Sequence, residues 1–225
     1  MVRSDITISK DEQVHDYLLC ANCEHLFNQN GEGWVLQHCH RNGDFELRRK
    51  LNEEPPHVDN GKFRCWAAAK IPSIDVAQLS YFASSIFWRA SVHDWKSGSR
   101  PLGLPQLGLK YDEEFRLYLL GKGPFPALAT MSVGLLDGSD YLNGILFPHG
   151  GKIDGYWRYD FVFLGLVFTL FLGNLVPAGT RSFCLNHSKE HFIAQSKMIN
   201  EMMLQHAEPL LQKSRPVGTL KKRVK

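Results

Sequence analysis

The most apolar run of the sequence reads Phe161-Val-Phe-Leu-Gly-Leu-Val-Phe-Thr-Leu-Phe-Leu172, and Gly173 and Asn174 follow it. A helix that spans a membrane needs about 20 apolar residues, whereas this run is shorter and is interrupted by Gly165. Its content of Phe and Val is typical of buried strands. We therefore predict two strands of a sheet joined by a hairpin turn near Gly165, with a membrane-seated protein as the alternative.

Upstream of this run, apolar residues recur at the three-and-four spacing of an amphipathic helix between Asp75 and Trp95. Asp75 is a suitable N-cap because Gln78 follows three residues later, and Gly98 is a suitable stop. Small or apolar residues occupy most of the helix surface, which predicts a central, buried position. The residues with this spacing are Leu79, Phe82, Ala83, Ile86, Phe87 and Ala90.

The remaining elements are predicted from shorter patterns. Acidic residues in the first turn favour a second helix from Tyr111 to Leu120, ended by Gly121. Two strands are expected within Pro126 to Pro148, on either side of a turn at Asp137-Gly138-Ser139. Apolar residues at helical spacing predict a final helix from Lys189 to His206.

The length and composition fit one hydrophobic core with an appended arm. The chain has 225 residues, of which 44% are hydrophobic and 22% are charged, and these values are ordinary for a globular protein. Turn-forming residues are concentrated in residues 1–60. We predict an α+β fold in which residues 1–60 form a small N-terminal module that contains a metal knuckle. Residues 61–208 would form a mixed helix and antiparallel-sheet body, and residues 209–225 a basic tail.

The formal net charge is only +3, but it is unevenly distributed because no acidic residue follows Glu208. Such a basic arm can contact nucleic acid or an anionic surface, or it can be a solvated terminus. The start of the sequence lacks the apolar stretch that a secretory signal needs, so a cytoplasmic location is expected. The basic residues of the tail are Lys213, Arg215, Lys221, Lys222, Arg223 and Lys225.

Cys20-Ala-Asn-Cys23 is the most distinctive chemical motif of the chain. The five cysteines are an odd number in a long chain, which favours reduced thiols or metal ligands over a disulfide framework. Two thiolates at this spacing supply two of the four ligands of a tetrahedral zinc ion, and His38 and Cys39 are predicted to supply the other two. A redox pair or two packed thiols are the alternatives, although no predicted strand leads into a helix here as in thioredoxin. The further ligand options are His40, His25 and His15.

The segment around this motif resembles a known family. Leu18-Leu-Cys-Ala-Asn-Cys-Glu24, followed by Phe27 and by Glu32-Gly-Trp34, is similar to the second zinc-knuckle half of bacterial HNH, or His-Me finger, endonucleases. In that family a first Cys-x-x-Cys pair and a Ser-His-Ile-type segment precede the knuckle. The resemblance implies a structural zinc ion, a divalent metal ion for catalysis, and a His that acts as the general base toward water.

The sequence departs from that family pattern upstream of the knuckle. Nineteen residues precede Cys20, and they contain neither the first cysteine pair nor the His segment. We therefore expect either a shortened relative without the nuclease half or a different site rebuilt from His15 and the His38-Cys39-His40 cluster. The resemblance covers about residues 15–40.

A second candidate site lies between Trp88 and Trp95. Arg89 and His93 stand four residues apart in the predicted helix and so share one face. Arg89 is suited to grip a phosphate or a carboxylate, and His93 to act as an acid, a base or a second donor. The alternative is that Arg89 and Asp94 are capping or pairing residues at the helix end.

Other histidines are less specific candidates. His149 precedes two glycines in a turn that can contact phosphate through backbone N–H groups, or that is only a turn. His187 and His191 stand four apart at the start of the predicted last helix and could ligate a metal ion with Cys184, or they could be surface histidines. No P-loop, dinucleotide-binding or Gly-x-Ser-x-Gly motif is present, which excludes those enzyme classes.

These patterns favour an HNH-like zinc-knuckle protein that binds nucleic acid, with nuclease activity left open. The weak catalytic candidates are His15, His40, Arg89 and His93. The predicted zinc ligands are Cys20, Cys23, His38 and Cys39, and a divalent ion for catalysis would be a second metal. The alternative function is a non-enzymatic protein-interaction module of bacterial or phage origin, in which the knuckle only staples the N-terminal module.

Overall fold

The computed structural model describes residues 6–9, 16–97, 100–137, 144–197, 199, 201 and 215–218. The α-helices are α1 (Ala21–Phe27), α2 (Gly33–His38), α3 (Glu46–Asn52), α4 (Val76–Val92), α5 (Leu109–Leu119) and α6 (Ala178–Ser182). A π-helical segment, η1 (Asn28–Glu32), lies between α1 and α2, and a 3-10 turn, η2 (Ala68–Lys70), follows β5. The second predicted helix is therefore confirmed as α5.

The strands fall into one large sheet and several short pairs. The large sheet contains β4 (Val58–Asp59), β5 (Phe63–Ala67), β8 (Ala129–Leu135), β9 (Ile145–Ile153), β10 (Tyr156–Phe163), β11 (Leu166–Leu172) and β12 (Phe192–Ser196). The short pairs are β2 (His40–Arg41) with β3 (Asp44–Phe45), β6 (Lys96–Ser97) with β7 (Arg100–Pro101), and β1 (Ile6–Ser9) with β13 (Arg215–Gly218).

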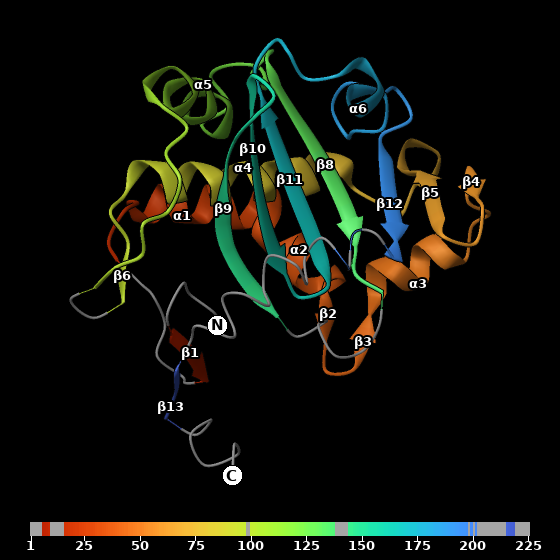
Figure 1. The fold of residues 1–225 in the computed structure, drawn as a ribbon, viewed down its shortest axis with the longest axis horizontal. Helices are drawn as coiled ribbons and strands as arrows, with labels where there is room; N and C mark the ends of the chain where they lie inside the picture. Colours follow the sequence, from red (N-terminus) through yellow and green to blue (C-terminus); the bar gives the residue numbers. More distant parts are fainter. Residues whose placement is uncertain are drawn as a thin grey trace.

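The large sheet has the strand order β4-β5-β12-β8-β11-β10-β9 (Figure 1). Neighbouring strands in it run antiparallel, except that β12 and β8 run parallel. The α+β fold class is confirmed. The sheet is antiparallel as expected at every pair but this one, where β12 enters beside β8 in the same direction.

β10 and β11 form the hairpin that the apolar run predicts. Their register pairs Phe161 with Phe168, and the turn lies at Leu164 and Gly165. Both turn residues have positive φ values, 45° and 87°, and such turns match the twist of the strands that flank them. The prediction of a hairpin near Gly165 is therefore confirmed. Within the described residues, no helix combines the length and the apolar character needed to cross a lipid bilayer.

α4 crosses one face of the large sheet and lies behind the strands in Figure 1. Phe82 is the centre of this contact, because its ring centroid lies 6.2 Å from that of Phe161, 5.2 Å from Phe163 and 5.6 Å from Phe168. The central, buried position predicted for this helix is confirmed.

The start of α4 follows its predicted signal and its end does not. The Asp75 carboxylate accepts a hydrogen bond from the backbone N–H of Gln78 at 3.0 Å, as expected of an N-cap. The helix ends at Val92, before the predicted stop at Gly98, because His93 has extended backbone angles (φ −135°, ψ 137°). The segment that follows turns into β6.

Residues 16–60 belong to the main core. α1, η1 and α2 form one continuous helical segment, because the residues at both junctions keep right-handed helical backbone angles. Val35, Leu47 and Leu51 are fully buried in the same cluster as the large sheet. At Gly31 the segment approaches α4 so closely that a Cβ would lie 2.7 Å from the backbone nitrogen of Phe82. Residues 16–60 and the large sheet therefore share one core.

The predicted helix from Lys189 to His206 is wrong in its first part. Phe192–Ser196 form β12, which pairs with β5 on one side and with β8 on the other. Ile193 is fully buried there, so sheet pairing and burial outweigh helical spacing. Of the rest of that stretch the structure describes residues 197, 199 and 201, which are helical.

The sheet face opposite α4 carries a buried ion pair. Side chains alternate along a strand, so Asp160 and Thr169 face away from the layer that contains Phe161 and Phe168. Asp160 is only 4% exposed. Its carboxylate accepts two hydrogen bonds from Arg158, at 2.9 and 3.0 Å, and one from the Thr169 hydroxyl at 2.5 Å. These three donors satisfy a charge that is almost removed from water.

Candidate functional site

Cys20 and Cys23 lie together at the start of α1. Cys20 is the N-cap residue, with extended backbone angles, and its side chain is exposed. Cys23 lies one turn later in the helix and is half-buried. The helix begins where the Glu24 N–H donates to the Cys20 carbonyl at 3.0 Å. The three-residue spacing thus presents two accessible thiols at the same helix end.

The two thiols have different acidities because they are joined by a hydrogen bond. The backbone N–H of Cys23, and then its S–H, donate to the Cys20 sulfur and hold the pKa of Cys20 below its ordinary value. The pKa of Cys23 is raised, first by this hydrogen bond to Cys20 and then by partial burial. Cys20 is therefore the thiol that ionises more readily, as expected beside the N–H groups of a helix start.

Aromatic packing holds this cysteine turn against the body of the protein. Phe27, the last residue of α1, is buried, and its ring meets those of Tyr81 and Trp88 of α4 edge-on at 5.8 and 6.1 Å. Such edge-to-face pairs add to the hydrophobic effect of burial. Leu19, the residue before Cys20, packs against the same cluster, so the thiols sit on an anchored helix start; no strand leads into it among the described residues.

The structure places His38 and Cys39 at the opposite end of the same helical segment. Residues 21–38 are helical without a break, and at about 1.5 Å per residue this separates its ends by about 25 Å. The four predicted zinc ligands are therefore not brought together. Among the described residues, no group of three or more His, Cys, Asp or Glu side chains is arranged to hold a metal ion.

His38 is held by its own surroundings. Its ring stacks on Trp34 at 3.8 Å, Nδ1 lies 2.8 Å from the Trp34 carbonyl oxygen, and Nε2 lies 2.9 Å from Lys50 Nζ. Burial is the main cause that lowers the pKa of His38. Cys39 is buried, its S–H donates to the Leu36 carbonyl at 3.6 Å, and burial raises its pKa. Both residues are therefore packed parts of the fold.

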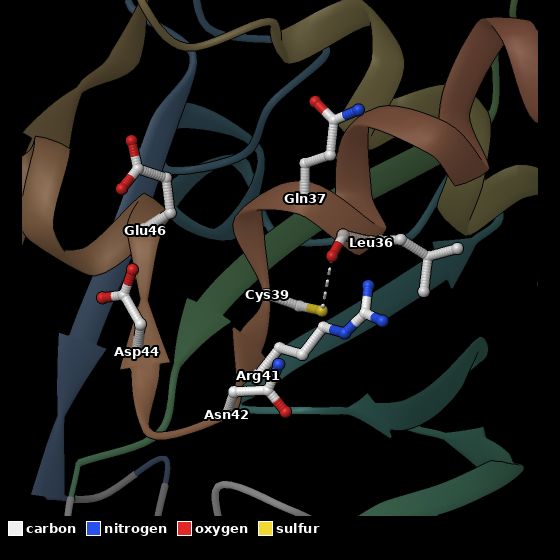
Figure 2. A pocket seen from close by; sticks show the side chains of 7 residues that line it. All are labelled: Leu36, Gln37, Cys39, Arg41, Asn42, Asp44 and Glu46. Atoms are coloured by element: carbon white, nitrogen blue, oxygen red, sulfur yellow. Dashed lines mark hydrogen bonds between the residues drawn. The ribbon is translucent and has the colours of Figure 1, made fainter.

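A pocket of about 270 Å³ lies between the end of α2 and the β2–β3 hairpin (Figure 2). Cys39 lines it, with Arg41 on one side and the carboxylates of Asp44 and Glu46 on the other. Glu46 is already engaged by Arg49, which donates to it at 2.7 and 2.6 Å. The mixed charges of this pocket suit neither an anion nor a metal ion bound by side chains alone.

His40 is packed into the fold near this pocket. It is nearly buried, its ring meets that of Phe45 edge-on at 6.2 Å, and its backbone N–H donates to the Leu164 carbonyl at 2.8 Å. His25 is exposed on α1, two residues beyond Cys23. His15 lies outside the described residues.

Arg89 and His93 do not share a helix face, because α4 ends between them. Arg89 is paired with Glu32 of η1, and its guanidinium lies 5.0 Å from the ring centroid of Phe27. His93 Nε2 lies 2.9 Å from the carboxylate of Asp16. Arg89 is therefore an ion-pairing residue, which was the alternative to an anion site. The sequence carries no local signal for the Glu32 partner, which is 57 residues away.

The other three candidate histidines contact backbone carbonyl oxygens of the sheet and of its connections. His149 lies on β9, with Nδ1 3.0 Å from the Phe147 carbonyl oxygen. His187 Nε2 lies 3.0 Å from the Ala129 carbonyl oxygen, and His191 Nδ1 contacts the Leu185 carbonyl. His187 and His191 lie in turns between α6 and β12, so the helical spacing predicted for them is wrong. Burial raises the pKa of Cys184 to about 12.

The basic tail falls mostly outside the described residues. Of residues 209–225, the structure describes Arg215–Gly218, which form β13 and pair in parallel with β1 near the start of the chain. Comparisons with known proteins add nothing to these observations, because no family model, curated protein or solved structure matches the chain.

Proposed function

We propose that the chain is a zinc-binding protein that contacts nucleic acid, with Cys20 and Cys23 as two of four zinc ligands. The observation that carries this proposal is the pair of accessible thiols in the first turn of an anchored helix. Zinc takes thiolates as ligands, and the N–H groups of a helix start favour the ionised sulfur. The two thiols on the described residues fit two of the four ligand positions of a tetrahedral site.

The other two ligands come from outside the described residues or from a second polypeptide. His15 is the nearest candidate in the sequence, since it precedes the pair by five residues. A site completed in this way would fix the segment before Cys20 against α1. A structural zinc site of this kind contributes directly to folding stability.

Nucleic-acid binding is supported by the family resemblance and by the charge of the tail. Six Lys and Arg residues and no acidic residue follow Glu208, and a cationic arm of this kind makes phosphate contacts that weaken as salt rises. Nuclease activity is not part of the proposal. Within the described residues, Arg89 is paired with Glu32, and His93 with Asp16, instead of facing a common metal or water site.

Zinc content tests the proposal. After purification under reducing conditions, elemental analysis is expected to find about one half to one zinc ion per chain, depending on whether two copies share it. Cys20→Ser and Cys23→Ser are expected to lose this zinc. Cys39→Ser, a variant of a thiol at the far end of the helix, is expected to keep it. Wild-type protein without zinc, or zinc that persists in both of the first two variants, would overturn the proposal.

The nucleic-acid part has its own measurement. Fluorescence anisotropy with a labelled DNA duplex and a single-stranded RNA is expected to show binding that falls steeply with salt, and a chain ended after Glu208 is expected to lose most of it. If zinc is present but neither nucleic acid binds, the result favours the alternative function, a protein-interaction module in which zinc only stabilises the N-terminal part.

The opposite pKa shifts of the two thiols favour a second candidate, a dithiol that exchanges with disulfides. The Cys20 thiolate would attack a partner disulfide, and Cys23 would then displace the partner's second thiolate, so that the partner is reduced and the pair is oxidised to a disulfide. This reaction needs a Cys20 thiol that is exposed and has a lowered pKa, and the hydrogen bonds from Cys23 lower the pKa of the exposed Cys20.

Alkylation kinetics separate a reactive pair from inert thiols. Iodoacetamide is expected to modify Cys20 about tenfold or more faster than Cys65 and Cys184 at neutral pH, because burial raises the pKa values of those thiols to about 11 and 12. Its rate profile should also rise at lower pH than that of Cys23. Peptide mass spectrometry measures the rates. Equal rates at Cys20 and Cys65, or no Cys20–Cys23 disulfide after exposure to oxidised glutathione, would exclude the redox function.

A further inference from the structure

A hydrogen bond between two basic side chains joins the end of α2 to α3. Lys50 Nζ lies 2.9 Å from His38 Nε2, and the other ring nitrogen, Nδ1, lies 2.8 Å from the Trp34 carbonyl oxygen. His38 is 7% exposed, and its ring stacks on that of Trp34 with 3.8 Å between the ring centroids. The imidazole is therefore held at both of its nitrogens and on one face.

These contacts determine which ring nitrogen carries the proton. A carbonyl oxygen only accepts, so Nδ1 of His38 carries a proton and donates it to Trp34. The Lys50 ammonium only donates, so Nε2 is the unprotonated acceptor. Lysine is the more basic of the two groups, with an ordinary pKa of about 10.4 against about 6.5 for histidine, so the proton between them belongs to Lys50. His38 is neutral in this arrangement.

The charges around His38 come from one neighbouring helix. Among the described residues, the charged groups that act on the ring are Lys50 and Glu46, both of α3. α2 itself has no other titratable side chain, and the segment before α4 contributes the Ser73 carbonyl, 3.4 Å from Lys50 Nζ. Burial first, and then the Lys50 charge, lower the pKa of His38, whereas the Glu46 carboxylate raises it.

A proton on Nε2 of His38 is incompatible with this hydrogen bond, because two donors would then face each other across 2.9 Å. Lys50 is free to leave, since its side chain is 20% exposed and its Nζ already lies 3.7 Å from the Glu46 carboxylate. The charged ring is free to stay, because its Nδ1–H keeps the Trp34 carbonyl and a cation is attracted to the Trp34 ring face. Lys50 is therefore the side chain that moves.

We propose that His38 and Lys50 form an acid-sensitive latch between α2 and α3. The latch is closed at neutral pH, and it opens when His38 takes up a proton at Nε2 and releases Lys50. It lies at the other end of the helical segment from the Cys20–Cys23 pair and does not depend on zinc. Glu46 lines the neighbouring pocket (Figure 2), so opening adds a positive charge beside the wall of that pocket.

Nuclear magnetic resonance on the full chain tests the latch from about pH 8 to about pH 5, a range around the ordinary pKa of histidine. At the upper end, His38 is expected to carry a proton on Nδ1 and none on Nε2. On acidification, the nuclear Overhauser contact between the Lys50 ε-methylene protons and the His38 ring is expected to be lost, with the same midpoint as the protonation of His38. The signals of Lys62, which is exposed, should not follow this midpoint.

Two variants separate the latch from simple burial of a histidine. His38→Gln replaces Nε2 by an amide oxygen that does not titrate, so Lys50 is expected to keep its contact with residue 38 across the whole pH range. Lys50→Met removes the ammonium and keeps the apolar stem, so His38 is expected to take up its proton at higher pH than in wild type. Lys62→Met is the matched control and should leave the His38 midpoint unchanged. If His38→Gln does not fold, the comparison of the two lysine variants still decides.

The latch also makes folding stability depend on pH. The pKa of His38 is lower in the folded chain than in the unfolded chain, so the unfolded chain binds the proton first. The stability that the neutral ring provides is therefore complete above about pH 6.5 and is lost as the pH falls below it. The midpoint of urea unfolding is expected to fall more steeply on acidification in wild type than in His38→Gln.

Any of four results would contradict the proposal. They are a proton on Nε2 of His38 at neutral pH, a ring that stays neutral down to about pH 5, a Lys50–His38 contact that persists after the ring has become charged, and equal His38 midpoints in wild type and Lys50→Met. The last two would show that His38 is only a buried histidine whose titration does not involve Lys50.

Discussion

Phe82→Ala is expected to lower the free energy of unfolding by about 3 to 5 kcal/mol, the usual loss for a large aromatic side chain in a packed core. Phe82 is 2% exposed, and its ring lies against three phenylalanine rings of β10 and β11. α4 and the sheet cannot close this space easily, because η1 already contacts the α4 backbone at Phe82 across Gly31. Denaturant unfolding followed by circular dichroism measures the loss.

Phe183→Ala is the matched control for this prediction. Phe183 carries the same side chain but is 48% exposed, so much less apolar surface returns to water when it is truncated. The loss in this variant should be well under half of that in Phe82→Ala. Equal losses in the two variants would contradict the assignment of Phe82 to the centre of the core.

Asp160→Ala is expected to cost about 3 kcal/mol of folding stability, because it leaves the Arg158 guanidinium without the carboxylate it bonds twice. The Thr169 hydroxyl also loses its acceptor on a buried sheet face. The Arg158 side chain keeps 23% of its surface exposed, so partial hydration places the loss at the lower end of the range for buried pairs. The same unfolding measurement applies.

The exposed pair of Glu113 and Arg116 provides the comparison for Asp160. Glu113→Ala removes a carboxylate from an ion pair of similar length, 2.7 Å, whose side chains face water. Such surface pairs contribute about 0 to 1 kcal/mol. A double variant, Arg158→Met with Asp160→Val, should recover part of the loss, because no unpaired charge remains. A loss in Asp160→Ala no larger than that in Glu113→Ala would show that the buried pair is not a stabilising feature.

Local chemistry was sufficient to predict the parts of the fold that depend on adjacent residues. The hairpin turn needs a residue that adopts positive φ readily, which Gly165 provides, and the α4 start needs a carboxylate three residues before a free N–H. Both requirements are visible in a few consecutive residues. The class of the fold followed from the same hairpin and helix.

The arrangement of distant segments could not be predicted in the same way. β12 has the apolar spacing of a helix, and only its pairing with β5 and β8 makes it a strand. The thiol pair is visible in the sequence as a motif, but its separation from His38 and Cys39 depends on an unbroken helix through Asn28–Glu32. The Asn-Gly in that stretch looks like a turn in the sequence, and packing against α4 instead makes it a π-helical segment.

The position of β12 also affects how the protein is made. Its residues follow β5 and β8 in the sequence, yet they lie between these two strands, so the large sheet cannot close before Phe192–Ser196 have been synthesised. During that time β5 and β8 each present an unpaired edge, and pairing over such a sequence distance is slow. Nascent chains in this state are prone to aggregate and are typical clients of chaperones. The growing chain, more than the finished one, is therefore the form of this protein that needs protection.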